Sequence, residues 1–305
     1  MTTDLLFKNF HLLADTPGGV KKLRELILQL AVKGRLVPQN PEDEPASVLL
    51  ERIKEEKKRL IREGKIKKQK PLPEIKPEEM PYELPEGWEW TCFDEVGIVN
   101  PRNHLADELE VSFIPMASIS DQYGIPVKYE RGVWGKLKQG YTHLAENDIV
   151  LAKITPCFQN KKSAVMKGLL NHCGAGTTEL HVIRPINNLL IPDYALLFLK
   201  SPIFISEGIP KMTGSAGQKR VPRDYFARTP FPLPPLPEQH RIVAKVDQLM
   251  ALCDELEASL TRSQADGQKL MQSVVVGMSG QNMMKDSMSM VNASNRLLAS
   301  SGCSG

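Results

Sequence analysis

Two segments of the sequence combine lysine and arginine with glycine and small polar side chains. The first, AKITPCFQNKKSAVMKG (152–168), carries four lysines and no acidic residue, and the second, KMTGSAGQKRVPRDYFAR (211–228), carries five cations against Asp224 alone. Each therefore has a local charge of about +4, more than the formal net charge of +3 of the whole chain. Lysine ammonium groups bind DNA phosphates, whereas Arg, Gln and Asn pair with base edges. The two segments together predict a DNA-binding surface.

Individual side chains of these segments suit different contacts with DNA. The lysines should supply salt-dependent phosphate affinity, while Gln159, Gln218 and Arg220 are candidates for base contacts, because an amide or a guanidinium can pair with two base atoms at once. Gly214 and Gly217 would let the backbone approach a duplex closely. For either segment alone, the alternative is a solvated turn with ordinary surface charge. The predicted DNA-binding residues are Lys153, Thr155, Gln159, Asn160, Lys161, Lys162, Thr213, Ser215, Gln218, Lys219 and Arg220.

The sequence carries no recognisable motif of an enzyme or a metal centre. GSAGQKR (214–220) lacks the spacing of a phosphate-binding loop and the Ser or Thr that would hold magnesium. NPRN (100–103) lacks the second proline and the aromatic residue of the clamp that amino-methyltransferases use, and no serine elbow is found. The five cysteines are scattered without metal-ligand spacing, which favours reduced thiols. We therefore predict no catalytic residue, no metal site and no cofactor on this chain.

Composition and hydropathy are typical of a globular protein outside the membrane. The 305 residues are 41% hydrophobic and 25% charged. No apolar run approaches the roughly 18 residues that a membrane span needs. The N-terminus, MTTDLLFKNFHLLADTPGGVKK, lacks the features of a secretory signal. We therefore expect a cytoplasmic protein without a membrane partner.

The first part of the chain, residues 1–84, predicts two helices and a linker. Thr16 and Pro17 fit the start of a helix that runs through GVKKLRELILQLAVKG and stops at Gly34. The second helix, ASVLLERIKEEKKRLIREG, stops at Gly64 and has its apolar residues on one face. The repeated prolines of KIKKQKPLPEIKPEEMPYELPEG indicate an extended linker.

The middle part, residues 85–236, changes to the shorter period of strands. NDIVLAKI, KSAVM and TELHVIRP are typical of short strands bounded by Gly, Pro and Asn. One helix is expected over PDYALLFLKSPIFISEG (192–208). The pattern predicts a compact, strand-rich α+β domain, and it does not determine the strand order.

The third part, residues 237–278, predicts a long regular helix of roughly 60 Å, at ~1.5 Å per residue. Its apolar residues recur at alternating steps of four and three, the spacing of a coiled-coil seam. This strict repeat favours pairing with another helix, and the alternative is an amphipathic helix that lies on its own domain. The predicted pairing residues are Ile242, Val246, Leu249, Leu256 and Leu260. Residues 279–305 lack the period and predict a disordered tail.

Several of these segments resemble the specificity (S) subunits of type I restriction–modification systems. PLPPLPEQHRIVAKVDQLMALCDELEASL is similar to the conserved spacer of that family. PEGWEW, NDIVLAKITPCFQNKKSAV, TTELHVIRP and MTGSAGQKRVPRDYFARTPFPLPPLPEQ are similar to its target recognition domain. LRELILQLAVKGRLVPQNPEDEPASVLLERI matches its N-terminal conserved helices. Together the matching segments cover most of residues 16–277.

The resemblance implies a non-catalytic subunit with an α+β fold. One strand-rich target recognition domain would be flanked by long conserved helices that form a coiled-coil spacer. The domain would read one half of a bipartite site in double-stranded DNA through the two polar segments. The helices would dock adenine-N6 methyltransferase subunits, which use S-adenosylmethionine, and a restriction subunit that uses ATP and magnesium to translocate DNA would join them.

The chain departs from the family because it contains one recognition domain, where a full subunit contains two. One interpretation is a half-subunit that dimerises with itself through its helices and reads an interrupted palindrome. The other is a truncated, non-functional fragment that acts only as a coiled-coil interaction module.

Overall fold

The structure, a computed structural model, describes residues 18–67 and 75–300, with side chains described as far as residue 273. The chain divides into two units, Met1–Ala251 and Leu252–Gly305. The first unit holds the front helices, the sheets and the start of the long helix α10 (Leu236–Ser300). The rest of α10 belongs to the second unit.

The two front helices are α3 (Gly19–Val32) and α4 (Ala46–Arg62). Each stops just before the glycine that the sequence predicts, because Gly34 and Gly64 have left-handed φ angles of 65° and 70°. At Gly34 an added Cβ would lie 2.4 Å from Cγ of Pro85, so only glycine fits there. Thr16 and Pro17, the predicted start of α3, lie outside the described residues.

Short strands form three sheets in the first unit. They are β1 (Glu89–Thr91), β2 (Gly97–Val99), β3 (Glu110–Ile114), β4 (Glu130–Val133), β5 (Thr142–Ala145), β6 (Ile149–Ala152), β7 (Ser163–Val165), β8 (Cys173–Gly176), β9 (Leu180–Pro185) and β10 (Phe231–Leu233). One four-stranded sheet has the order β2-β9-β6-β7, and the other has the order β4-β3-β8-β5. The pairing of β1 with β10 brings the entry and exit of the domain side by side.

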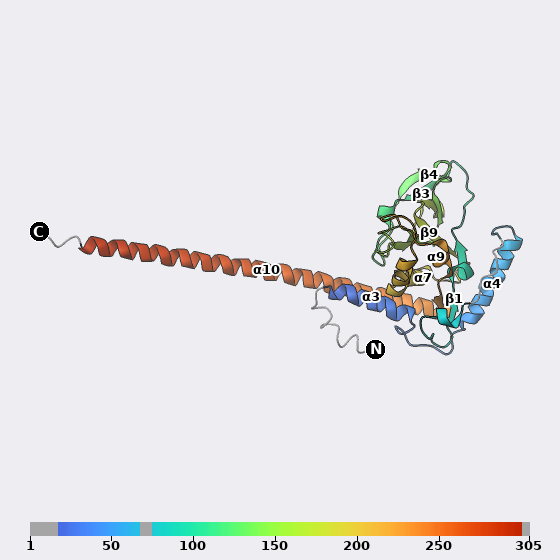
Figure 1. Ribbon diagram of the computed structural model, residues 1–305, viewed down its shortest axis with the longest axis horizontal. Coiled ribbons are helices and arrows are strands. Elements are labelled where there is room, and N and C mark those ends of the chain that lie inside the picture. The colour runs from blue at the N-terminus through green and yellow to red at the C-terminus, as the bar shows by residue number, and fades with distance from the viewer. Residues whose placement is uncertain (1–17, 68–74, 301–305) are drawn as a thin grey trace. The chain divides into compact units, whose positions relative to one another are not determined.

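The strand pattern of the sequence is confirmed at the three predicted segments, which contain β6, β7 and β9. The two larger sheets share a core, in which Ile114 and Leu144 of one sheet cluster with Val150 and Val182 of the other. In Figure 1, β3 and β4 lie at the end of the first unit that is farthest from α3. The fold is α+β, with a strand-rich domain flanked by helices, as the sequence predicts.

Short helices connect the strands. They are α5 (Phe93–Val96), α6 (Trp134–Leu137), α7 (Pro192–Lys200), α8 (Pro202–Gly208) and α9 (Arg223–Arg228), with the 3-10 turns η1 (Pro77–Glu79), η2 (Met116–Ser118), η3 (Leu170–His172) and η4 (Ile209–Lys211). The prediction of a single helix over 192–208 is wrong. Ser201 is extended, as a residue before proline prefers to be, and its hydroxyl accepts the N–H of Phe204 at 3.4 Å to start α8.

The first turns of α10 are anchored to the strand-rich domain and to the front segment. Trp88 Nε1 donates to Glu238 Oε2 at 2.9 Å, and the Arg241 guanidinium pairs with the Asp43 carboxylate. The Gln239 amide accepts the N–H of Ile191 at 2.9 Å and donates to the Pro234 carbonyl at 3.1 Å. These contacts hold the first turns of α10 against the strand-rich domain and the front segment.

The end of α10 differs from the sequence prediction. A disordered tail was expected from residue 279, whereas the helix continues to Ser300. Residues 281–300 contain no proline and no glycine, and a helix that is already formed extends with one hydrogen bond for each residue added. The helix therefore continues beyond the residue at which the coiled-coil period ends. Residues 301–305 lie outside the described residues.

Candidate nucleic-acid interface

The two polar segments of the sequence lie next to each other in the structure. We call residues 153–162 the first polar loop and residues 211–221 the second polar loop. The N–H of Thr155 donates to the Lys219 carbonyl at 2.9 Å, and the N–H of Val221 donates to the Lys153 carbonyl at 2.8 Å. These bonds connect residues that are 64 and 68 positions apart in sequence, and they join the two loops into one surface of the first unit.

A tight turn shapes the second polar loop. Thr213 and Arg220 exchange two backbone hydrogen bonds, of 3.0 and 2.8 Å, and Gln218 N–H donates to the Ser215 carbonyl at 3.0 Å. Gly214 and Gly217 have φ angles of 123° and 76°, which side chains other than glycine rarely adopt. The turn leaves Thr213, Ser215, Gln218 and Lys219 exposed to solvent.

The first polar loop is anchored by a buried aromatic ring. Phe158 is 0% exposed, whereas its neighbours Gln159 and Asn160 are exposed. The Asn160 N–H donates to the Pro156 carbonyl at 3.0 Å, which closes a turn. The Thr155 hydroxyl is buried and has no hydrogen-bond partner among the described residues. The loop therefore presents two amide side chains on a rigid base.

Arg220 is held by a carboxylate that sequence reasoning did not single out. Its Nε and Nη2 donate to the two oxygens of Glu179 at 2.9 and 2.7 Å, and its Nη1 donates to the Gln218 carbonyl at 3.0 Å. The hydrogen bond from Arg220 lowers the pKa of Glu179. Burial lowers the pKa of Lys153, against the attraction of Glu179. Glu179 lies in the predicted strand segment TTELHVIRP, where no spacing signal connects it to Arg220.

The lysines of the first polar loop are tied to other parts of the first unit. Lys161 Nζ pairs with Glu25 of α3 at 2.6 Å, and Lys162 Nζ donates to the Met116 carbonyl at 3.5 Å. Lys153, Lys161 and Lys162 are each half-buried. Their predicted role as free phosphate ligands therefore has less support than that of Lys219.

Lys200, a second residue that the sequence did not reveal, lies beneath the first polar loop. It is 1% exposed, and its Nζ donates to the carbonyls of Ser120, Asp121 and Lys161 at 3.1, 3.2 and 3.1 Å. Burial lowers the pKa of Lys200 to about 7. The buried ammonium group thus joins the first polar loop to the segment that follows η2.

That same segment contacts α10 within the first unit. Tyr123 Oη donates to Asp247 Oδ1 at 2.8 Å. The first polar loop is therefore connected to α3 directly through Lys161, and to α10 indirectly through Lys200 and Tyr123. This chain of contacts fixes the loop relative to both helices.

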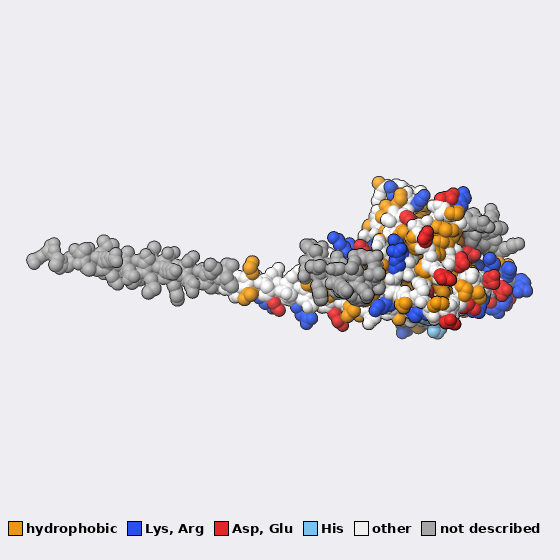
Figure 2. Space-filling model, turned by 90° about the horizontal axis from the view of Figure 1, so that it is seen from below, with side chains coloured by type: hydrophobic (Ala, Val, Ile, Leu, Met, Phe, Trp, Pro, Cys, Tyr) orange, Lys and Arg blue, Asp and Glu red, His pale blue; other side chains and the backbone are white. Residues whose placement is uncertain are grey.

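Charge is mixed on the face of the first unit that Figure 2 shows. In Figure 2, lysines and arginines are interspersed with carboxylates and apolar side chains on the face in view. Several arginines are paired within the chain; for example, Arg223 donates to the buried Asp94 at 2.8 and 3.2 Å. An arginine that is paired in this way is less available to a DNA phosphate than a cation without such a partner.

The predicted pairing residues of α10 fall into two groups. Ile242, Val246 and Leu249 are 0–1% exposed, so the first unit itself covers them, as in the alternative of an amphipathic helix on its own domain. Leu256 and Leu260, in the second unit, are half-buried.

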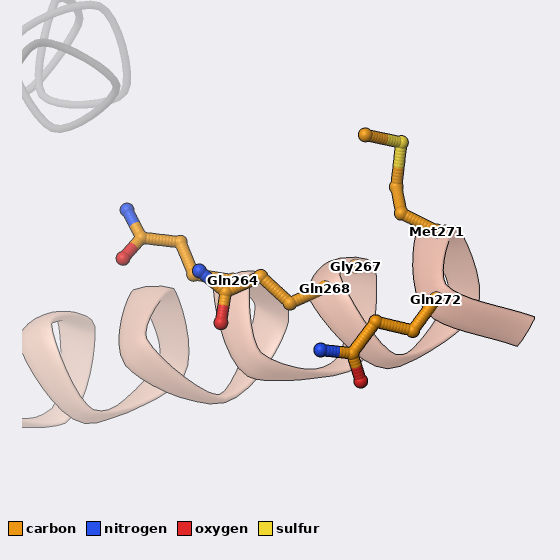
Figure 3. Close-up of a pocket in the computed structure, with 5 residues that line it drawn as sticks. All are labelled: Gln264, Gly267, Gln268, Met271 and Gln272. Carbon is orange, nitrogen blue, oxygen red and sulfur yellow. The ribbon is translucent and has the colours of Figure 1, made fainter. Parts of the chain in front are cut away.

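Further along the second unit, α10 exposes apolar side chains. Leu270 and Met271 are 66% and 71% exposed. A hollow beside Gly267, where no side chain projects, is lined by Gln264, Gln268, Met271 and Gln272 (Figure 3). This stretch of helix has the surface that could accept another helix.

Among the described residues, no group of three or more His, Cys, Asp or Glu side chains is arranged to hold a metal ion. The four cysteines that the structure describes are free thiols. Within the same residues, no helix combines the length and the apolar character that a membrane crossing requires.

Comparison with known proteins identifies the family. Residues 85–263 match the family described as the type I restriction modification DNA specificity domain. The specificity subunits of the type I restriction enzymes EcoAI and EcoEI, both from Escherichia coli, are each 54% identical over 258 residues. Those alignments cover 84% of this chain but only 44% and 43% of the relatives, so the chain spans less than half of their length.

A solved structure agrees with this result. A chain from work on complex assembly and conformational transition of the type I restriction–modification system is 26% identical, with a TM-score of 0.53. The match covers 64% of this chain and 50% of that chain. The family match covers more than half of the chain and includes both polar loops and the start of α10. The chain belongs to the type I restriction modification DNA specificity domain family.

Proposed function

We propose that this chain is the DNA-reading part of a type I specificity subunit and recognises one half of a bipartite target. The observation that carries the proposal is the joining of the two polar loops. Two backbone hydrogen bonds hold them together, and six of the predicted residues on them are exposed. The exposed residues are Gln159, Asn160, Thr213, Ser215, Gln218 and Lys219.

These side chains divide naturally between positioning and reading. Lys219 is exposed and makes no ion pair with a described residue, so its ammonium group suits a phosphate. Gln159, Asn160 and Gln218 carry amides that suit base edges, adenine above all.

Arg220 suits guanine, because Glu179 occupies the edge of the guanidinium formed by Nε and Nη2. The opposite edge, formed by Nη1 and Nη2, has the fork geometry that pairs with O6 and N7 of guanine. The side chain of Arg220 is 42% exposed, and a base at that edge would share or replace the Gln218 carbonyl that Nη1 contacts. Glu179 would then act as a positioning residue for the reading arginine.

The helices would set the position of the reading loops. Lys161 contacts α3 and Tyr123 contacts α10, so displacement of either helix would displace the first polar loop. We propose that α10 pairs with a second copy of this chain through Leu256, Leu260 and the exposed residues beyond them. Methyltransferase subunits carrying S-adenosylmethionine and an ATP-dependent restriction subunit would dock on the helices in the cytoplasm, and this chain would perform no catalysis itself.

Selection from a randomised pool of duplex DNA tests the reading role. The full chain should enrich one half-site motif, and Gln218→Ala should relax the preference at one or two positions of it. Lys128→Ala, which alters an exposed lysine outside both loops, should leave the motif unchanged. Duplex binding without any sequence preference would instead favour a coiled-coil interaction module.

Light scattering tests the pairing. The full chain should have the mass of a dimer, and Leu256→Asp with Leu260→Asp should produce a monomer. A wild-type monomer, alone and with its methyltransferase partner, would overturn self-pairing and leave the reading role to be judged by the DNA selection.

A further inference from the structure

A polar pocket lies at the edge of the β4-β3-β8-β5 sheet. The residues that line it are outside the two polar loops. Its volume is about 480 Å³, and the residues that line it include Arg102, His104, Trp134, Lys138, Gln139 and His143. Arg102 belongs to NPRN (100–103), the segment that lacks the features of a methyltransferase clamp. The pocket plays no part in the contacts described above.

The hydrogen bonds of His143 determine its tautomer. The backbone N–H of Asn103 donates to Nδ1 at 2.9 Å, so Nδ1 carries no proton. The neutral ring then carries its proton on Nε2, which donates to the Lys138 carbonyl at 3.0 Å. Burial lowers the pKa of His143, which agrees with a neutral ring.

This tautomer leaves the Arg102 guanidinium without an acceptor in the part of the chain that the structure describes. Its Nη1 lies 3.3 Å from Nε2 of His143, but both groups are donors, so the contact is not a hydrogen bond. Arg102 is exposed at the pocket and forms no ion pair with a described residue. A guanidinium that stays charged and unpaired beside a pocket is suited to an anionic ligand.

The remaining charges of the pocket cancel each other. Asp107 is its only acidic residue, and both carboxylate oxygens accept from Lys138 Nζ, at 2.8 and 2.7 Å. The Lys138 carbonyl is engaged by His143. The two strongest acceptors at the pocket are therefore occupied, and the net charge that remains is that of Arg102. Such a pocket favours a ligand that offers only acceptor atoms.

The strand register places this pocket at the same end of the sheets as the joined loops. Asn100 extends the pairing of β2 with β9, because its N–H donates to the Val182 carbonyl at 2.8 Å and its Oδ1 accepts the Val182 N–H at 2.9 Å. Arg102 follows in the direction of Leu180, where β9 begins.

On the other side of β9, the N–H of Lys153 donates to the Glu179 carbonyl at 2.9 Å. The turn at 177–179 thus has the first polar loop on one side. On the other side, the Thr142 hydroxyl, one residue before His143, donates to the Thr177 carbonyl at 2.9 Å. The strand β5, which carries His143 of the pocket, and the first polar loop therefore contact the same turn.

We infer that the pocket binds a backbone phosphate of DNA through Arg102, next to the half-site that the polar loops read. The inference rests on the proposed function. Phosphate oxygens are acceptors only, which matches the free donors of the pocket. The contact extends the DNA-binding surface across both sheets, and it holds the register of the duplex without reading sequence.

Salt dependence distinguishes a phosphate contact from a base contact. The full chain and Arg102→Gln are compared on the duplex that the wild-type chain enriches from a randomised pool. Loss of one phosphate contact should make the slope of log affinity against log salt shallower by about 1 and weaken binding at 100 mM salt by roughly five- to tenfold, with the order of sequence preference unchanged. Arg102→Lys, which keeps the charge, should restore most of the slope.

A matched control is Arg131→Gln, which removes an exposed arginine of β4 outside the pocket and should leave slope and affinity unchanged. A wild-type slope for Arg102→Gln would overturn the phosphate site while leaving the proposed function intact. An altered sequence preference would overturn it in favour of a base contact. Absence of salt-dependent binding by the wild-type chain would overturn the proposed function and the site together.

Discussion

The two polar loops have similar compositions, but the chain uses their cations differently. In the first loop, Lys161 pairs with Glu25 at 2.6 Å and Lys162 reaches the Met116 carbonyl. In the second loop, Lys219 is exposed and makes no ion pair with a described residue. Lys161 and Lys162 hold the first loop to the rest of the first unit, whereas in the second loop Arg220 is paired with Glu179 and Lys219 faces solvent. Local charge alone therefore does not identify a DNA ligand; the partners of each cation decide.

The largest expected effect is a loss of stability on substitution of Lys200. This residue contacts the first polar loop and not the second. In Lys200→Met the carbonyls of Ser120, Asp121 and Lys161 lose their donor while the apolar stem is kept. The free energy of unfolding should fall by about 2–4 kcal/mol, because buried carbonyls without a donor are costly. Urea unfolding measures the change, with Lys167→Met, at an exposed lysine, as the control.

Hydrogen exchange tests whether the loss of Lys200 affects the first loop alone. In Lys200→Met the amide of Asn160 should exchange faster, while the amides of Thr213 and Arg220 in the second loop should be unaffected. An unchanged or increased stability would mean that the cost of burying the ammonium group outweighs its three hydrogen bonds.

Low pH should destabilise the protein through His181, which contacts the end of the second polar loop. Its ring is stacked on Phe226, and its Nε2 donates to the Val221 carbonyl at 3.0 Å, while Nδ1 is buried and has no hydrogen-bond partner among the residues described. Burial lowers the pKa of His181 to about 4. The unfolded chain takes up this proton near its ordinary pKa of about 6.5, and the folded chain does not, so stability is lost as pH falls below that value.

The loss from this group should reach about 2–3 kcal/mol between pH 6.5 and 4. Urea unfolding of the wild-type chain and of His181→Gln over this range isolates the contribution, because the carboxyl groups common to both cancel. Equal pH slopes for the two proteins would contradict the prediction.

Local features of the fold were predictable because their causes are local. Gly34 and Gly64 end helices through their own φ angles, and β6, β7 and β9 follow from apolar runs between turn residues. Pro202 indicates a break at Ser201, but the continuous apolar character of the segment favoured a single helix. Periodicity also located the start of α10, and it did not reveal that the first unit covers Ile242, Val246 and Leu249.

The sequence named the residues of the candidate site, but it did not predict their contacts. Lys161 meets Glu25 across 136 residues, and Arg220 meets Glu179 across 41 residues. No pattern of spacing connects such pairs, because the strand order that brings them together is set by tertiary packing. Lys200 and Arg102 were missed for the same reason.

Discrimination between bases should depend on Glu179. In Glu179→Gln the Arg220 guanidinium loses its charged partner, so its plane is no longer fixed. Preference for the enriched half-site over a substituted one should fall by about 1–2 kcal/mol, while affinity for unrelated duplex stays the same or rises, since a negative charge has been removed. Competition binding measures both quantities.

Glu25→Gln is the matched control for this change, because it removes the carboxylate that holds Lys161 of the first loop. It should lower base discrimination by less than Glu179→Gln does, because Lys161 is not itself proposed to read a base. Loss of discrimination in Glu25→Gln alone would mean that the first loop, rather than the second, carries the reading side chain.

The smallest expected effect is a change in salt dependence, and it tests most directly whether the lysines of the two loops have different roles. Lys219→Ala should make the slope of log affinity against log salt shallower by about 1, because a free ammonium group that binds a phosphate releases a counterion. Lys161→Ala should leave the slope near that of the wild-type chain, because its ammonium group is already neutralised by Glu25. If the two variants lost equal slope, DNA would have to displace Glu25 from Lys161, and the first loop would change its partner on binding. If both variants kept the wild-type slope, the phosphate contacts would have to be made by other residues of the surface.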